Sequence, residues 1–135
     1  MTKISRNDIK KRGFNRFIKS FGYSLDGLIY AYKYEQSMFI HFIVTCGVIM
    51  ANLFFGVSGI EWLISLMAIG MVLAAELINT AIEAVVDLVT LEIHPLAKIA
   101  KDCGSAATFV LSMMAGAIGF VIYLPYIFDF VGKLF

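Results

Sequence analysis

The sequence predicts an all-α integral membrane protein in which one amphipathic surface helix precedes three transmembrane helices. Of its 135 residues, 60% are hydrophobic, whereas soluble domains carry about 45–50% apolar residues. The apolar residues are concentrated in three long runs, each of a length that can cross a bilayer. Seven of the eleven basic residues lie in the first nineteen positions, which is typical of a cytoplasmic end against anionic lipid. We therefore expect a single membrane domain over residues 1–135.

The first predicted element is a helix over residues 14–33 that lies in the plane of the membrane interface. Apolar side chains recur along it with helical spacing, at Phe14, Phe17, Phe21, Leu25 and Leu28. Basic residues such as Arg16 and Lys19 lie beside this apolar stripe. An apolar stripe bordered by basic residues is typical of an interfacial amphipathic helix.

Three apolar segments predict transmembrane helices over residues 38–57, 62–91 and 96–123. About twenty residues at 1.5 Å each cover the hydrocarbon layer. The second segment is longer than a span needs, so its last turns should project from the membrane. We expect tight turns at residues 58–61 and 92–95, and a short aromatic tail after the third span.

The distribution of Lys and Arg predicts the orientation of the chain. The region up to residue 33 carries eight basic residues and the 92–102 segment carries two. The predicted turn at 58–61 carries none, and the C-terminal end carries only Lys133. Cytoplasmic loops hold an excess of basic residues, so we expect a multi-pass protein with a cytoplasmic N-terminus and an outer C-terminus.

Polar side chains form one stripe on the second predicted transmembrane helix. Its members are Glu76, Asn79, Glu83 and Asp87. The spacing of i, i+3, i+7 and i+11 places all four on one helix face. Carboxylates are costly in lipid, so such a stripe indicates a functional site. It points to metal binding or proton transfer at the membrane surface.

The predicted topology brings further charged residues to the inner end of this stripe. Glu35 precedes the first span, and Lys101 and Asp102 lie where the third span begins. Carboxylates that accept Mg²⁺ and a lysine for phosphate oxygens are the parts of a phosphoryl-transfer site. Glu76 lies about 10 Å deeper along the helix than Glu83. It can therefore meet a group embedded in lipid, while Glu83 can meet a water-soluble one.

Purely structural roles for these side chains are the alternative. Glu83 and Lys101 could form an interhelical ion pair, and Asn79 could hydrogen-bond across helices. Cys46 and Cys103 have no CxxC spacing and fit small apolar packing residues. No GxxxxGK[ST] or GxGxxG motif of a soluble nucleotide-binding fold is present, and no nucleic-acid partner is expected.

Two motifs resemble those of the prokaryotic diacylglycerol kinase family. From residue 76 to 87 the sequence reads Glu-x-x-Asn-Thr-Ala-Ile-Glu-x-x-Val-Asp, and from 94 to 102 it reads His-Pro-Leu-Ala-Lys-Ile-Ala-Lys-Asp. The His-Pro-Leu-Ala-Lys form and the pair Ile40-His41 are similar to the undecaprenol kinase branch, which is typical of Gram-positive bacteria. The resemblance extends from Arg16 to about Pro125.

The resemblance implies a homotrimer of three-span subunits in the bacterial plasma membrane, with active sites shared between subunits. It implies a lipid kinase that transfers the γ-phosphate of MgATP to a membrane lipid alcohol, with undecaprenol as the preferred candidate. Mg²⁺ and ATP are thus the implied cofactors. A physical argument also favours an oligomer, because one three-span subunit cannot easily shield Glu76 from lipid.

The resemblance also assigns roles to individual residues. Glu76 would be the catalytic base toward the lipid hydroxyl, while Glu35 and Glu83 would hold the metal ion and ATP. The remaining ATP contacts would come from Arg16, Tyr23, Lys101 and Asp102, and the substrate-orienting residues would be Asn79, Ser105 and Asp87. Phe39 stands where the family often has a basic residue.

Two other functions are retained as alternatives. One is a diacylglycerol kinase of the same family, because the residues that would contact the lipid tail are ordinary Leu, Ile, Val and Phe. The other is a small non-enzymatic membrane protein whose carboxylate stripe lines a polar intramembrane cavity.

Overall fold

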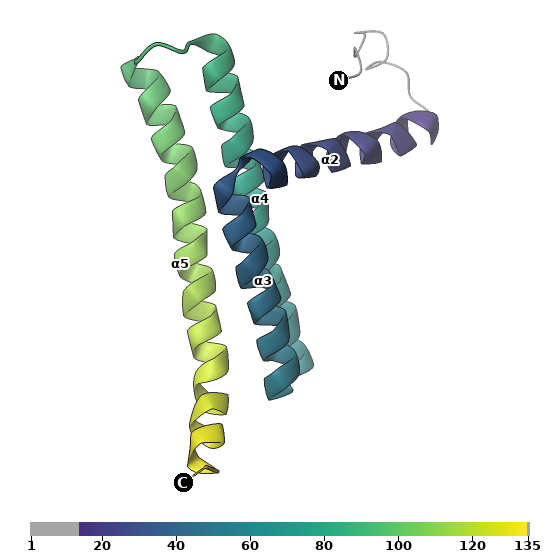
Figure 1. The fold of residues 1–135 in the computed structure, drawn as a ribbon, viewed down its shortest axis with the longest axis vertical. Coiled ribbons are helices and arrows are strands. Elements are labelled where there is room, and N and C mark those ends of the chain that lie inside the picture. Colours follow the sequence, from purple (N-terminus) through teal and green to yellow (C-terminus); the bar gives the residue numbers. More distant parts are fainter. Residues whose placement is uncertain (1–13, 135) are drawn as a thin grey trace.

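The computed structural model describes residues 14–134, which form four α-helices and no strand (Figure 1). The basic residues of the first twelve positions therefore lie outside the described part of the chain. The helices are α2 (Phe14–Tyr34), α3 (Gln36–Phe55), α4 (Gly59–Val89) and α5 (Pro95–Gly132). The all-helical architecture agrees with the sequence prediction.

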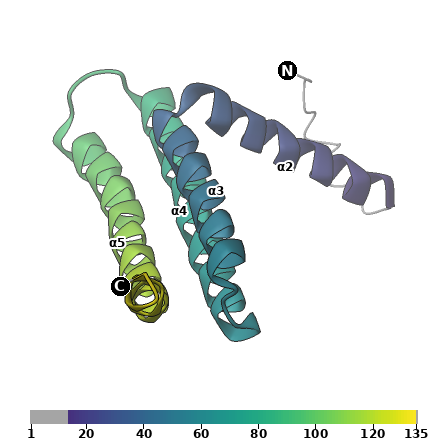
Figure 2. The same ribbon diagram turned by 60° about the horizontal axis from the view of Figure 1, so that its bottom comes forward.

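Helices α3, α4 and α5 run alongside one another, and α2 leaves this bundle at a steep angle (Figures 1 and 2). All three bundle helices are long and apolar enough to cross a membrane. Large hydrophobic side chains are exposed along each of them. Such a surface suits lipid as the surrounding solvent, because lipid tails are as apolar as these side chains.

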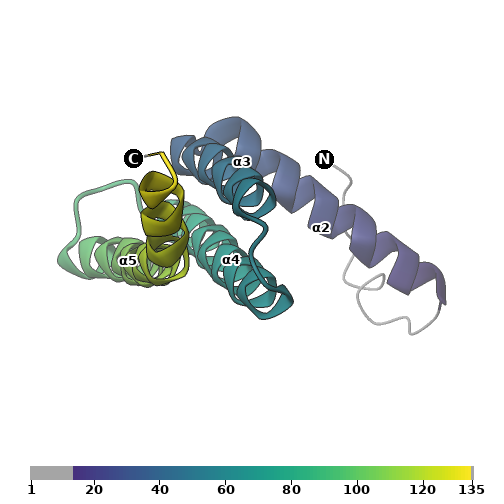
Figure 3. The same cartoon turned by 90° about the horizontal axis from the view of Figure 1, so that it is seen from below.

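The bundle has two distinct ends. The α4–α5 connection lies at one end, here called the loop end, and the C-terminus lies at the other (Figure 1). Seen from below, α2 extends outward from the bundle (Figure 3). It joins α3 through the single residue Glu35, which is the N-cap of α3.

The turn expected at residues 58–61 lies at residues 56–58 in the structure, because α3 ends at Phe55 and α4 begins at Gly59. The Ser58 backbone N–H donates to Glu61 Oε2 at 2.7 Å, and Ser58 Oγ accepts from the Glu61 N–H at 3.3 Å. This reciprocal capping box satisfies two helix-end donors and so favours an early helix start. Gly56, at φ +61°, ends α3 in the left-handed conformation that glycine adopts without strain.

Helix α5 continues beyond the expected end at Tyr123 and reaches Gly132, so the expected aromatic tail is helical. Pro125 lies inside this helix. Proline is tolerated in transmembrane helices because neighbouring groups satisfy the freed backbone carbonyls. The Tyr126 hydroxyl donates to Glu61 Oε2 at 2.7 Å, which ties the extension to the first turn of α4.

A buried polar cluster joins the three bundle helices away from the loop end. Asn52 of α3, 1% exposed, donates from Nδ2 to Ser65 Oγ of α4 at 2.8 Å. The Tyr123 hydroxyl of α5 donates to Asn52 Oδ1 at 2.6 Å. Interhelical hydrogen bonds of this kind contribute about 0.6 kcal/mol each in a membrane. The cluster therefore fixes the lengthwise register of α3, α4 and α5, and with it the level of the residues at the loop end.

Candidate active site

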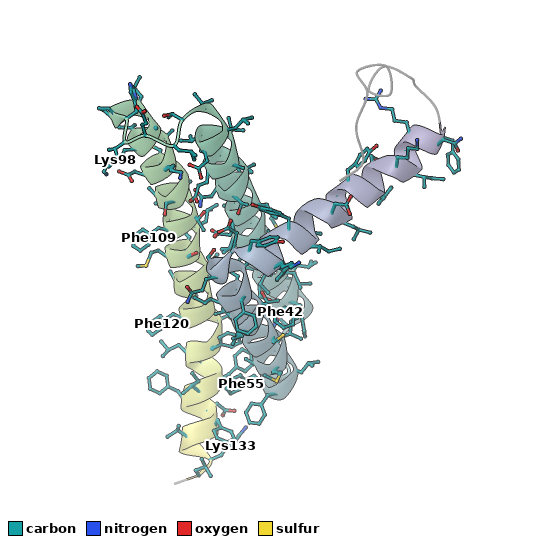
Figure 4. The ribbon with its side chains drawn as sticks, turned by 45° about the horizontal axis from the view of Figure 1, so that its top comes forward. Phe42, Phe55, Lys98, Phe109, Phe120 and Lys133 are labelled. Carbon is teal, nitrogen blue, oxygen red and sulfur yellow. The ribbon has the colours of Figure 1, made fainter. Side chains whose placement is uncertain are left out.

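The polar stripe of α4 passes from the interior of the bundle to its loop end. Glu76 is 5% exposed and Asn79 is 8% exposed, whereas Glu83 is half-buried and Asp87 is exposed. In Figure 4, Lys98 marks the loop end, Lys133 the opposite end, and Phe120 lies between them on α5. Successive members of the stripe are thus increasingly accessible toward the loop end.

Glu76 is buried within a single chain. Its carboxylate oxygen Oε1 accepts a hydrogen bond from the Ser37 hydroxyl in the first turn of α3. Our expectation that a subunit interface is needed to shield Glu76 was therefore wrong, because α3 already covers it. Ser37 was not predicted as a site residue. The sequence feature that could have indicated Ser37 is its position in the short polar segment directly before the first apolar run.

Glu83 and Asn79 are paired along α4. The Asn79 amide Nδ2 donates to Glu83 Oε1 at 3.1 Å. This is a hydrogen bond between side chains four residues apart on one helix, where such neighbours face each other. Asn79 therefore does not form the interhelical hydrogen bond considered as its structural role, at least with the described residues. Instead it fixes the orientation of the Glu83 carboxylate.

Two ion pairs lie beyond Glu83 at the loop end. Lys101 Nζ of α5 donates to Asp87 Oδ1 of α4 at 2.7 Å. We had considered an ion pair between Lys101 and Glu83, but Lys101 pairs with Asp87 instead. Lys98 pairs with Asp102 one turn along α5, and both side chains are largely exposed. Exposed ion pairs contribute only about 0–1 kcal/mol, so an anionic ligand can displace their carboxylates at little cost.

A cavity of about 280 Å³ lies at this end between α4 and α5. Its charged lining comprises both ion pairs, namely Asp87, Lys98, Lys101 and Asp102, together with Glu92 of the connecting segment. The connecting residues 90–94 complete the wall. Ammonium groups in a water-accessible cavity suit phosphate oxygens. Ser105, the remaining predicted residue of α5, is exposed one turn further along the helix.

Arg16 and Tyr23 lie in the N-terminal half of α2, and α2 points away from the bundle (Figure 1). Both side chains are exposed. Arg16 precedes the end of α2 by eighteen residues, which corresponds to about 27 Å of helix. One chain therefore does not bring these two predicted ATP contacts together with Lys101 and Asp102.

Glu35 and Glu83 are chemically suited to Mg²⁺, because neither carboxylate enters an ion pair within residues 14–134. The Glu35 side chain forms no capping hydrogen bond although it occupies the N-cap of α3. In the described residues no three His, Cys, Asp or Glu side chains gather as a metal cluster. Mg²⁺ is often held by one or two carboxylates together with substrate phosphates. The donor set fits an ion shared with a nucleotide better than an ion enclosed by protein.

Comparison with known proteins identifies the kind of site. The family described as prokaryotic diacylglycerol kinase matches residues 22–123. The chain is 38% identical to an undecaprenol kinase of Bacillus subtilis over 124 residues, 92% of this chain and 97% of the relative. It is 36% identical to a diacylglycerol kinase of Haemophilus influenzae, over 81% of this chain and 92% of the relative. It is also 40% identical to a diacylglycerol kinase of Pseudomonas aeruginosa, over 73% of this chain and 80% of the relative. The chain therefore belongs to the prokaryotic diacylglycerol kinase family and is a membrane lipid kinase with ATP as its phosphate donor.

Proposed function

We propose that this kinase transfers the γ-phosphate of MgATP to undecaprenol at the cytoplasmic face of a bacterial plasma membrane. The observation that carries the proposal is the placement of two carboxylates at two depths on α4. Glu76 of α4 is buried beside the first turn of α3. Glu83 lies seven residues nearer the loop end on α4, which is about 10 Å along the helix. Similarity to an undecaprenol kinase over 92% of this chain supports the choice of lipid.

Glu76 is the group that accepts the proton of the lipid hydroxyl in this proposal. Its level is that of the first turn of α3, because Ser37 in that turn donates to its carboxylate. If α2 lies on the membrane surface, as its apolar stripe predicts, this level is the interface at which a lipid alcohol presents its hydroxyl. A positioned carboxylate there can orient the hydroxyl and accept its proton during phosphoryl transfer.

Glu83 and Glu35 hold the magnesium ion in this proposal, with Asn79 fixing the Glu83 carboxylate. When bound, Mg²⁺ supplies neutralisation of the charge on the nucleotide phosphates. Lys101 turns from Asp87 to the phosphate oxygens, which its exposure and the adjoining cavity permit. Asp87 orients the Lys101 side chain before the nucleotide binds, and Asp102 and Ser105 contribute polar groups from α5.

The proposal includes a homotrimer with the N-terminus in the cytoplasm and the C-terminus outside. Eight basic residues up to residue 33 support this orientation. The outward direction of α2 (Figure 3) supports sharing of sites between subunits, because α2, which carries Arg16 and Tyr23, makes no contact with α5, which carries Lys101, within the described residues. Arg16 and Tyr23 would reach the nucleotide held by a neighbouring subunit.

A diacylglycerol kinase is the second candidate. It is supported by identities of 36% and 40% to the two diacylglycerol kinases. The non-enzymatic alternative has no such support, because every relative named above is a lipid kinase.

The first prediction separates the two carboxylates of α4. Glu76→Gln should lower kcat by about 10²–10⁴-fold but leave MgATP binding intact, because only the proton acceptor is lost. Glu83→Gln should weaken MgATP binding as well, because a metal ligand is lost. Nucleotide affinity should be measured beside turnover, with Asp129→Asn at the opposite end of α5 as the matched control. Loss of binding in Glu76→Gln together with normal binding in Glu83→Gln would show that the roles are reversed.

The second prediction concerns the lipid. Undecaprenol and diacylglycerol should be offered to the purified protein at equal mole fraction in the same mixed micelles, with ATP labelled at the γ-phosphate. We expect kcat/KM to be at least about tenfold higher for undecaprenol, which corresponds to about 1.4 kcal/mol. A preference for diacylglycerol would select the second candidate. Labelling of neither lipid would contradict both.

The third prediction concerns shared sites. Arg16→Ala and Lys101→Ala subunits should each be impaired alone at low ATP concentration. When equal amounts are unfolded, mixed and reassembled, about a quarter of the sites in random trimers should combine an intact Arg16 with an intact Lys101 from different subunits. Activity should then rise above that of either variant. A mixture no more active than the mean of the two would contradict sharing.

A further inference from the structure

Gly104 of α5 lies so close to Asn79 of α4 that no residue with a Cβ atom would fit at position 104 without a shift. A Cβ atom at residue 104 would lie 2.5 Å from Asn79 Oδ1 and 3.5 Å from Asn79 Cγ. Real Cβ atoms essentially never approach another heavy atom this closely, so Asn79 or the helix would have to shift. Gly104 is buried, as is Asn79 Oδ1, which has no hydrogen-bond partner among residues 14–134.

The position is unusual among the described glycines. A Cβ at Gly119 would make only an ordinary contact with Tyr123 at 3.8 Å, and a Cβ at Gly116 would meet nothing within 4 Å. Of the glycines in residues 14–134, Gly104 is therefore the one at which an alanine would collide with a neighbour. The neighbour belongs to the polar stripe.

The orientation of the Asn79 amide follows from its two neighbours, the Glu83 carboxylate and Gly104 of α5. Nδ2 donates to Glu83 Oε1 at 3.1 Å. If the amide were turned around, its oxygen would face the carboxylate oxygen, and two acceptors would repel each other. The donor end must therefore point toward Glu83, and the oxygen end must point toward α5. The missing Cβ of Gly104 leaves the space that this oxygen occupies.

We propose that Gly104 is a positioning residue for Glu83, acting through Asn79. Its lack of a side chain lets the Asn79 oxygen lie against α5, so the Asn79 N–H stays on the Glu83 carboxylate. A methyl group at residue 104 would push the amide away and break that hydrogen bond. The consequence for metal binding rests on the proposed role of Glu83, whereas the steric coupling of residues 104 and 79 does not.

The test is a double-mutant cycle with a binding readout and a stability readout. Mn²⁺, as a spectroscopic substitute for Mg²⁺, should be titrated by electron paramagnetic resonance in the presence of a non-hydrolysable ATP analogue. Gly104→Ala should weaken Mn²⁺ binding by about tenfold, as expected for a lost hydrogen bond to a charged group. Gly116→Ala on the same helix should bind normally. In the Asn79→Ala background Gly104→Ala should cause no further loss, because the truncated side chain leaves room for the methyl group.

Melting temperatures without nucleotide or metal provide the second readout. Gly104→Ala should lower the melting temperature, and Asn79→Ala should remove most of this decrease. Normal Mn²⁺ binding by Gly104→Ala, or additive effects in the double variant, would overturn the inference. Glu83→Gln tests the proposed function separately. If Glu83→Gln binds Mn²⁺ normally, the metal assignment fails, and the melting-temperature cycle alone decides whether residues 104 and 79 are coupled.

Discussion

The cost of a carboxylate in hydrocarbon is the constraint on which the rest of this structure depends. A carboxylate that faces hydrocarbon without a partner is strongly unfavourable, and Glu76 lies in a helix apolar enough to cross a membrane. The first turn of α3 meets the requirement, because the Ser37 hydroxyl donates to Glu76 and leaves it 5% exposed. That contact sets the level at which α3 begins, and α2 leaves the bundle just before it. The buried Asn52–Ser65–Tyr123 cluster fixes the register further along the same three helices.

The same constraint explains how one helix can serve two kinds of substrate. Exposure along α4 rises from Glu76 through Glu83 to Asp87, so one stripe passes from a dry to a wet environment. In the proposed mechanism the lipid hydroxyl approaches the buried end and the nucleotide approaches the exposed end. The two ion pairs at the loop end hold their lysines, and in the proposed mechanism the nucleotide phosphates replace the carboxylates. Because these pairs are exposed, exchanging a carboxylate for a phosphate costs little.

The parts of this arrangement that depend on pattern could be predicted from the sequence. Three apolar runs predicted the three long helices, and the spacing of residues 76, 79, 83 and 87 predicted one polar face. The parts that depend on contacts between distant residues could not. Nothing in the local sequence shows that Ser37 reaches Glu76, or that Lys101 selects Asp87 over Glu83. Gly104 was not singled out from the sequence, because its close approach to Asn79 joins residues 25 positions apart.

The helix ends show the same limit. We expected the third transmembrane helix to end near Tyr123, but α5 continues to Gly132. A proline ends a helix more readily in water, where water can bond to the freed backbone groups. In an apolar environment the helix still satisfies most of the backbone hydrogen-bonding groups. The reason given for an oligomer also failed, because α3 covers Glu76 within one chain. The case for a trimer now depends on α2, whose predicted ATP contacts lie away from the rest of the site.

In the proposed mechanism the metal and nucleotide bind at the level of Glu83 and not at that of Glu76. Spin labels on two exposed positions of α4, Met67→Cys and Val85→Cys, would test it after Cys46 and Cys103 are replaced by alanine. Pulsed electron paramagnetic resonance then measures the distance from each label to Mn²⁺ bound with an ATP analogue. An ion at Glu83 lies about 3 Å along the helix from residue 85 and about 24 Å from residue 67. The account predicts a clearly shorter distance to the label at 85. Equal distances to the two labels would place the ion at Glu76, which is nine residues from each, and would contradict the account.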